Sequence, residues 1–231
     1  MFLVPFYIIQ TEKFNFSIPF YTSNLQQEIA IPDTDLAPSS SYTLDTNINI
    51  DGFKAYKLQT ETKLNFSGRA YGREDPFYSL IKIVNDVMFY NINHKILILS
   101  TSKESFTTFI KDFNIPDHSE YISLIKNEID FEKIISSGYS HGVQRVWFGK
   151  INDTQLKHEA LYGNRLEASE RYKELLKDNA KITNLTINIL YKNISINVMI
   201  TKDSGIILDT VKSFKSENEK LDFIMFIYEN I

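Results

Sequence analysis

Three polar residues in the N-terminal half have the types and order of a metal-dependent nuclease site. Asp51 lies upstream of Glu61, and Lys63 follows Glu61 in the pattern Glu-x-Lys. In nucleases of the PD-(D/E)xK type, such carboxylates hold Mg²⁺, and the lysine orients or helps to deprotonate the attacking water. The residues beside Glu61 are polar, so the same pattern also fits a solvated strand face. A Mg²⁺-dependent nuclease is therefore kept as an alternative and not as the leading prediction.

Two further groups of residues were weighed as sites. The four histidines do not have the spacing of metal ligands, and they fit turn or surface positions: His94, His118, His141 and His158. The stretch from Gly68 to Arg73 holds two glycines and two arginines, which fits either a phosphate-binding loop or an ordinary polar loop. We expect no metal site, no cofactor and no catalytic residues, and the chain is interpreted as non-enzymatic.

A segment of the C-terminal half mixes cations with aromatic side chains. This composition is typical of surfaces that bind nucleic acid, where cations meet phosphates and aromatic rings stack on bases. Interleaved glutamates bring the charge of the segment close to balance, so a solvated helix packed on a sheet is the competing interpretation. The residues predicted to contact nucleic acid are Arg145, Trp147, Lys150, Lys157, Arg165, Arg171 and Lys173.

The composition limits the class of protein. The chain has 231 residues, of which 43% are hydrophobic, so it can form one large domain or two small ones. Its net charge of −4 means that nucleic-acid binding requires a local basic patch. The sequence contains no cysteine, and the apolar N-terminus lacks the basic residues of a signal peptide. We expect a cytoplasmic location and no membrane partner.

The clearest structural pattern in the chain runs from residue 183 to residue 210. Leu185, Ile187, Ile189 and Tyr191 alternate with polar residues, and Ile194, Ile196, Val198 and Ile200 repeat the pattern. A two-residue loop at Lys192-Asn193 pairs these apolar residues across two strands on one face. A second turn ends at Gly205, expected to take positive φ, before a third strand. Ser216 and Glu219 form a capping box for an apolar C-terminal helix that covers the sheet.

The remaining segments predict alternating strands and helices. Strands are expected at residues 2–9 (with Pro5 marking a sheet edge), 14–21, 53–58, 63–70, 87–90, 96–99, 143–150 and 156–162, and a loop at 31–41. Helices are expected from Asp75, after a capping box of Thr101 and Glu104, at residues 117–137 and at 166–177. The Gly- and Ser-rich residues 136–142 are the candidate boundary between an N-terminal domain, 1–137, and a C-terminal domain, 138–231, of order ββαβββα. The predicted fold class is α+β, with two layered units of antiparallel strands and packed helices.

A family resemblance enters at the cation–aromatic segment. Phe148-Gly149-Lys150, then Leu156 to Ala160, then Tyr162-Gly163 and a helix resemble the RexA family of phage-exclusion proteins. The preceding hairpin and helix, residues 87–113, also resemble RexA and the Kiwa-type antiphage proteins (KwaB). The resemblance implies a non-enzymatic, often dimeric two-domain protein of phage defence that binds DNA or a protein partner.

These observations favour a binding protein of an antiphage or host–virus conflict system. Its predicted partners are nucleic acid (DNA), a protein partner or a second copy of the chain. The alternatives are the Mg²⁺-dependent nuclease and a structural subunit of a larger complex, in which the N-terminal strands form a sheet edge that pairs with another chain.

Overall fold

The computed structural model shows a mostly β protein. It describes residues 4–23, 38–65, 68–69, 71–72, 76–77, 80–113, 122–125, 129–152, 155–209 and 214–230. About half of these residues lie in strands and under a quarter in helices, and twelve strands pair in one antiparallel sheet. The prediction of an α+β fold with two balanced layered units is therefore wrong. The chain has more strand, and less helix, than its apolar spacing indicated.

The chain forms two compact units, and the first strand belongs to both. Unit 1 comprises residues 1–8 and 127–231, and unit 2 comprises residues 9–126. Strand β1 (Phe6–Phe14) therefore begins in unit 1 and ends in unit 2. The sequence-based boundary between residues 137 and 138 falls within the longer segment of unit 1.

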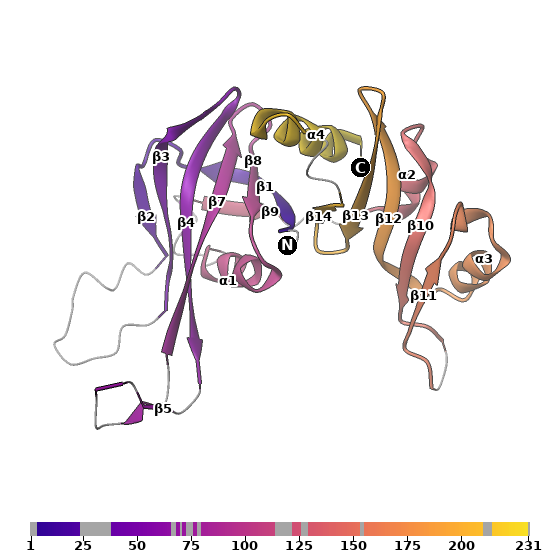
Figure 1. The fold of residues 1–231 in the computed structure, drawn as a ribbon, viewed down its shortest axis with the longest axis horizontal. Coiled ribbons are helices and arrows are strands. Elements are labelled where there is room, and N and C mark those ends of the chain that lie inside the picture. The colour runs from indigo at the N-terminus through magenta and orange to yellow at the C-terminus, as the bar shows by residue number, and fades with distance from the viewer. Residues whose placement is uncertain are drawn as a thin grey trace. The chain divides into compact units, whose positions relative to one another are not determined.

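Unit 1 is a sheet with helices (Figure 1). Its strands pair in the order β11-β10-β12-β13-β14-β1, and the start of β1 lies beside β14. The strands are β10 (Ser140–Gly149), β11 (His158–Tyr162), β12 (Lys181–Tyr191), β13 (Ile194–Thr201) and β14 (Gly205–Leu208). The helices are α2 (Phe131–Ser136), η3 (Leu166–Ala168), α3 (Glu170–Lys177) and α4 (Glu217–Asn230).

The β12–β13 hairpin has the register that the sequence predicts. Leu185 pairs with Ile200, Ile187 with Val198, Ile189 with Ile196, and Tyr191 with Ile194. A shift of one residue would turn the apolar residues of one strand to water, so burial fixes this register. The prediction of this hairpin, including its two-residue turn, is confirmed.

Helix α4 covers the apolar face of the hairpin. The backbone N–H of Glu219 donates to Ser216 Oγ over 3.2 Å, and Glu219 Oε2 accepts from the N–H of Lys215 over 2.8 Å. The first bond is the cap that the prediction requires, whereas the second goes to the residue before Ser216 and not to the Ser216 N–H that a capping box uses. The ring of Phe223 in α4 lies 5.0 Å from that of Tyr191, so helix and hairpin pack directly.

The turn before β14 differs from its prediction. Ser204, with φ of 61°, takes the left-handed conformation expected of Gly205. Gly205 serves another purpose, because a Cβ atom there would lie 3.0 Å from Tyr7 Cε1 and 2.8 Å from Thr201 Oγ1. The glycine therefore allows the Tyr7 ring of β1 to lie directly against β14.

Unit 2 is a second run of strands with one described α-helix. Its strands pair in the order β1-β8-β7-β4-β3-β2, and β9 pairs with β1. They are β2 (Phe20–Thr22), β3 (Ser40–Ile50), β4 (Phe53–Leu64), β7 (Leu80–Asn91), β8 (Ile96–Ser100) and β9 (Ile122–Ile125). The short strands β5 (Gly68–Arg69) and β6 (Pro76–Phe77) pair only with each other, and the helix is α1 (Lys103–Phe113).

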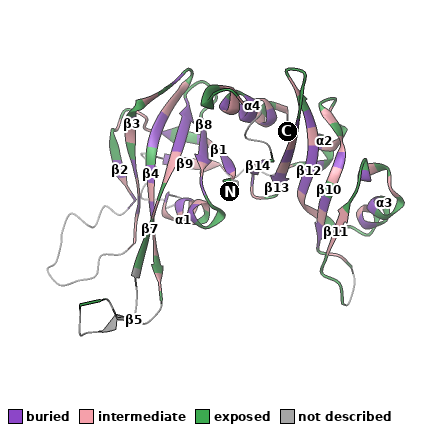
Figure 2. Cartoon of the chain, in the orientation of Figure 1, coloured by how far each residue is buried: buried purple, intermediate pink, exposed green. Residues whose placement is uncertain are grey.

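Aromatic rings fill the core of unit 2. The Phe14 ring lies 5.3 Å from Tyr42, 5.5 Å from Tyr56 and 4.6 Å from Tyr90. On the side of α1, Phe113 contacts Tyr42, and Figure 2 shows the buried positions running along β4 and β8. Each large ring buries much apolar area, so this cluster is a major source of the stability of unit 2.

Several predicted elements of unit 2 are wrong. Residues 53–64 form one continuous strand instead of two, and a strand at 40–50 begins inside the predicted loop. Residues 80–91 form one strand, so the helix predicted from Asp75 is wrong at 80–84, while the strand predicted at 87–90 is confirmed. The apolar residues Leu80, Ile81 and Val84 fit a helical period, but the segment forms a strand because it pairs with β4 along its whole length. The predicted helix at 117–137 also fails, since residues 122–125 form a strand and the described helix is only 131–136.

Strand β1 is not at a sheet edge. It has β14, β8 and β9 as neighbours, so the prediction that Pro5 marks an edge is wrong. The hypothesis of a subunit whose N-terminal strands pair with another chain stays a prediction, because β2, which overlaps the strand expected at 14–21, lies at the end of the sheet beside β3.

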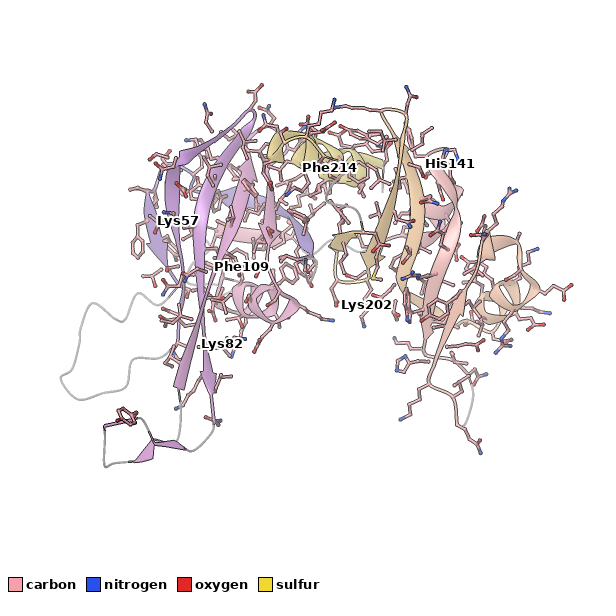
Figure 3. The ribbon with its side chains drawn as sticks, in the orientation of Figure 1. Lys57, Lys82, Phe109, His141, Lys202 and Phe214 are labelled. Atoms are coloured by element: carbon pink, nitrogen blue, oxygen red, sulfur yellow. The ribbon has the colours of Figure 1, made fainter. Side chains whose placement is uncertain are left out.

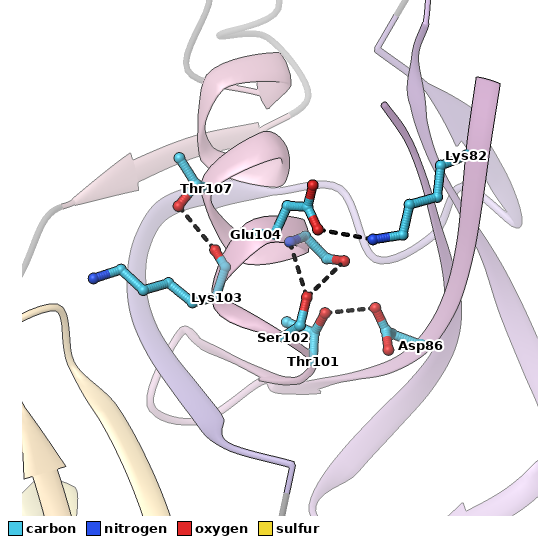
Figure 4. Close-up of polar contacts among 8 residues, drawn as sticks. Lys82, Asp86, Thr101, Ser102, Lys103, Glu104 and Thr107 are labelled. Atoms are coloured by element: carbon cyan, nitrogen blue, oxygen red, sulfur yellow. Dashed lines mark hydrogen bonds and ion pairs between the residues drawn. The ribbon is translucent and has the colours of Figure 1, made fainter. Parts of the chain in front are cut away.

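The capping residue of helix α1 is Ser102, one residue later than the predicted Thr101. Ser102 Oγ accepts from the N–H of Ser105 over 3.2 Å, whereas Thr101 Oγ1 donates to Asp86 Oδ2 over 2.5 Å (Figure 4). Glu104 forms an ion pair with Lys82 over 2.8 Å, which ties the first turn of the helix to β7. No helix in the described part of the chain is long and apolar enough to cross a membrane.

Candidate nucleic-acid interface

Strand β10 presents two different faces. Val146 and Phe148 are buried, and the Phe148 ring lies 5.5 Å from Tyr172 of α3. Arg145 and Trp147 alternate with them and point to the other side, where Arg145 is exposed and Trp147 is half-buried. We call the side of Phe148 the helix-covered face, and the side of Arg145 and Trp147 the polar face.

Strand register places the residues of the polar face in three rows. The first row is Tyr162, Arg145 and Thr186, the second is Ala160, Trp147 and Asn184, and the third is His158, Gly149 and Lys181, in each case on β11, β10 and β12. Directly paired residues of antiparallel strands project from the same side of the sheet. Side chains from three strands therefore surround Trp147.

Small residues adjoin Trp147 on two sides. Ala160 is its partner on β11, and Gly149 lies two residues further along β10. The Tyr162 ring meets the indole edge-on, with a centroid distance of 5.8 Å and an interplanar angle of 78°. A Cβ atom on Gly149 would lie 3.3 Å from His158 Nδ1, so the imidazole borders this position. The indole thus has Tyr162 on one side and the small Ala160 beside it, while His158 and Thr183 lie over Gly149.

The polar face is cationic. Arg145 and Lys181 are exposed on it, and the described strand residues that share this face on β10, β11, β12 and β13 include no Asp or Glu. Glu159 pairs with Phe148 and therefore belongs to the helix-covered face. The sheet thus places the cations on one face and Glu159 on the other. The nearly balanced net charge of the segment does not reveal this separation.

Helix α3 carries two of the predicted contact residues on the other side of the sheet. Arg171 donates to both oxygens of Glu159, over 2.8 and 2.6 Å, and to Glu174 over 3.2 Å. These bonds raise the pKa of Arg171 and lower the pKa of Glu159, since each charge stabilises the other. Arg171 is thus already paired with carboxylates, and Lys173 is exposed on the same helix.

The other predicted cations lie in connecting segments. Lys150 follows β10 and Arg165 precedes η3, both with φ of 54°, and Lys157 is exposed just before β11. A Cβ atom on Gly142 would lie 3.1 Å from Arg165 Cγ, which places the Arg165 side chain beside the start of β10. Of the seven predicted residues, strand geometry brings only Arg145 and Trp147 onto the polar face of β10.

Three residues of the polar face were missed by the sequence-based prediction. Tyr162, His158 and Lys181 reach the face because β11 and β12 pair with opposite edges of β10. Tyr162 could have been found from the alternation along residues 158–162, because side chains at 158, 160 and 162 of a strand point to the same side. Lys181 carried no such signal, because an irregularity between β10 and β12 near Phe148 changes the register.

The arrangement required by the nuclease hypothesis is not formed. Asp51 lies in the turn between β3 and β4, whereas Glu61 and Lys63 lie near the far end of β4. At about 3.3 Å per strand residue, the separation is on the order of 30 Å, too far for two ligands of one ion. Across the described residues, no three His, Asp or Glu side chains gather as a metal site.

The remaining candidates have ordinary positions. His94 lies in the turn between β7 and β8, and Figure 3 labels His141 at the start of β10. His118 and most of the stretch from Gly68 to Arg73 lie outside the described residues.

Neither a protein-family model nor a curated protein sequence matches the chain. The resemblance to RexA and Kiwa-type proteins stays a prediction.

Proposed function

We propose that the protein binds nucleic acid through the polar face of unit 1 without altering it chemically. One observation carries this proposal: Arg145, Lys181 and a partly exposed Trp147 share a sheet face whose described strand residues include no carboxylate. Cations neutralise phosphates, and an accessible aromatic ring offers a stacking surface for a base.

The resemblance to RexA and Kiwa-type proteins suggests the setting. We place the binding activity in the cytoplasm and in phage defence, where a protein that recognises invading nucleic acid can act without a catalytic site. The net charge of −4 restricts binding to a local surface, which fits a few cations on one face better than a protein coated in positive charge.

The test is a fluorescence-anisotropy titration of labelled DNA and RNA at several salt concentrations. We expect the affinity to fall steeply with salt, because binding releases counterions from the phosphates. Arg145→Glu should weaken binding strongly, since it removes a cation and places a carboxylate on the polar face. Running the products on a gel with Mg²⁺ present should show intact nucleic acid.

Lys173→Glu is the matched control, because it makes the same change of charge on the exposed surface of α3. It should leave the affinity near that of the unchanged protein. Absent binding, salt-independent binding, or equal losses from both variants would contradict the assignment to the polar face.

A further inference from the structure

We infer that the polar face takes single-stranded nucleic acid, with one unstacked base lying on Trp147. This inference rests on the proposed function and specifies its ligand. In a duplex both faces of each base are covered by neighbouring bases, whereas a single strand can turn a base onto an aromatic side chain.

The surroundings of Trp147 leave space for a base. Ala160 provides almost no side chain next to the indole, whereas the space over Gly149 is taken by Thr183 and His158, whose nearest atoms would lie 3.1 and 3.3 Å from a Cβ atom there. Tyr162 meets the indole edge-on and leaves its bicyclic ring system without a stacked partner ring among the described residues. An aromatic ring that is only half-buried beside a small neighbour can accept a second ring in a stacked arrangement.

The two cations are placed on either side of this position. Arg145 lies one row before Trp147 and Lys181 one row after it, which separates them by about 14 Å along the strand direction. A backbone that contacts both cations must pass Trp147 between them. The base of the intervening nucleotide then lies within reach of the indole.

An unpartnered hydroxyl group lies in the same rows. Thr186 pairs with Arg145 and is only 1% exposed, and its Oγ1 has no hydrogen-bond partner among the described residues. A buried polar group without a partner is unfavourable and gains free energy from any ligand that supplies one.

The sequence provides a direct reporter for this inference, because Trp147 is the only tryptophan of the chain. Titration with oligothymidylate or oligouridylate should quench its fluorescence, and the quench should saturate together with the anisotropy of a labelled strand. A duplex of equal length should bind more weakly and quench little. Trp147→Ala should weaken single-strand binding roughly 5- to 150-fold, the range measured for removal of a stacking aromatic residue, whereas Trp147→Phe should retain most of it.

Ala160→Leu tests the space beside the indole without removing any ligand-contacting group. The larger side chain should weaken single-strand binding and reduce the quench, whereas the matched Ala160→Ser variant should bind normally. Circular dichroism and urea unfolding of each variant check that the overall fold is retained.

The outcomes separate the inference from the proposed function. Binding of single strands without a tryptophan quench, or equal binding and quenching by a duplex, would overturn the inference and leave nucleic-acid binding intact. The absence of binding to every single-stranded and duplex probe would overturn the proposed function itself.

Discussion

Two buried tyrosines in the core of unit 2 differ by one hydrogen bond. Tyr56 Oη donates to the carbonyl oxygen of Phe16 over 3.1 Å, while the hydroxyl of Tyr42 has no hydrogen-bond partner among the described residues. Burial raises the pKa of both phenols far above the usual range, so both remain protonated. The unpaired hydroxyl lowers stability, because it lost its water on folding and gained nothing in return.

The first prediction is that Tyr42→Phe leaves stability unchanged or raises it, by up to about 1 kcal/mol. Tyr56→Phe should lower stability by about 1 kcal/mol, because it leaves the Phe16 carbonyl without its donor. Urea unfolding of the two variants checks this, since both remove one oxygen from the same aromatic cluster. Equal losses for both would show that the Tyr42 hydroxyl has a partner.

A carboxyl group on α1 should make stability depend on pH. Burial raises the pKa of Asp112, and the hydrogen bond from Ser40 Oγ, over 2.6 Å, and nearby Lys111 oppose this shift in part. A carboxyl whose folded pKa exceeds its unfolded value of about 4 stabilises the fold below that pH. This contribution is lost as the pH rises through the folded pKa.

The second prediction is that Asp112→Asn raises the urea midpoint near pH 7, and that the gain disappears toward about pH 4. The amide oxygen can still accept from Ser40, while no charge has to be buried. Asp222→Asn, at an exposed position of α4, is the control with the same loss of charge. An Asp112→Asn variant that is less stable than the unchanged protein at neutral pH would mean that the carboxylate is needed for packing.

At the residue scale, the sequence identified part of the candidate site. Arg145 and Trp147 were predictable because period-two alternation puts them on one side of a strand and Phe148 on the other. Sequence order does not show that Arg171 pairs with Glu159, which lies on a different element. The side chains that β12 places on the polar face could not be predicted from the sequence, because strand pairing is set by long-range contacts.

At the scale of elements, the β12–β13 turn lies where the sequence predicts it, but its two residues are not those that such a turn favours. Lys192 and Asn193 both have positive φ, at 47° and 64°, as a type I′ turn requires. The left-handed conformation is costly for lysine, which has a full side chain, and milder for asparagine. The apolar register of the two strands therefore forces this turn on residues that do not favour it.

The third prediction is that Lys192→Asn combined with Asn193→Gly stabilises unit 1 by about 0.5–1 kcal/mol, because Asn-Gly fits this turn best. The gain is limited by loss of the contact between Lys192 Nζ and the Tyr191 ring, at 4.9 Å. Thermal unfolding measures the change. Asn193→Val should act in the opposite direction, since a β-branched residue tolerates positive φ poorly.

The predictability of the other elements follows from their local signals. The hairpin was predicted from alternation, α3 from an amphipathic stripe, and α4 from a capping serine together with an apolar stripe. The first part of β7 was misread as a helix because the apolar residues at 80, 81 and 84 fit a helical period, and only pairing with β4 shows that this part is a strand. The strand at 40–50 was missed because polar residues interrupt its alternation.

At the scale of the whole molecule, the chain order of the two units matters most. Unit 2 is inserted in the sequence between the first residues of β1 and the rest of unit 1. Phe6 and Tyr7 pair with Ile206 and Gly205, so the N-terminal segment occupies the edge of β14. A chain that began at residue 127 would expose that edge, along with the buried side chain of Ile206.

The fourth prediction is that unit 1 folds and binds nucleic acid without unit 2 only if it keeps residues 1–8. A protein in which a long Gly/Ser linker replaces residues 9–126 should show cooperative unfolding by Trp147 fluorescence and retain single-strand binding, because every residue of the polar face belongs to unit 1. Residues 127–231 alone should be less stable and aggregate through β14. Light scattering and urea unfolding of the two proteins compare them directly. If the linked protein folds but does not bind, unit 2 contributes to the binding site; if residues 127–231 alone are equally stable, pairing of β1 with β14 is dispensable for unit 1.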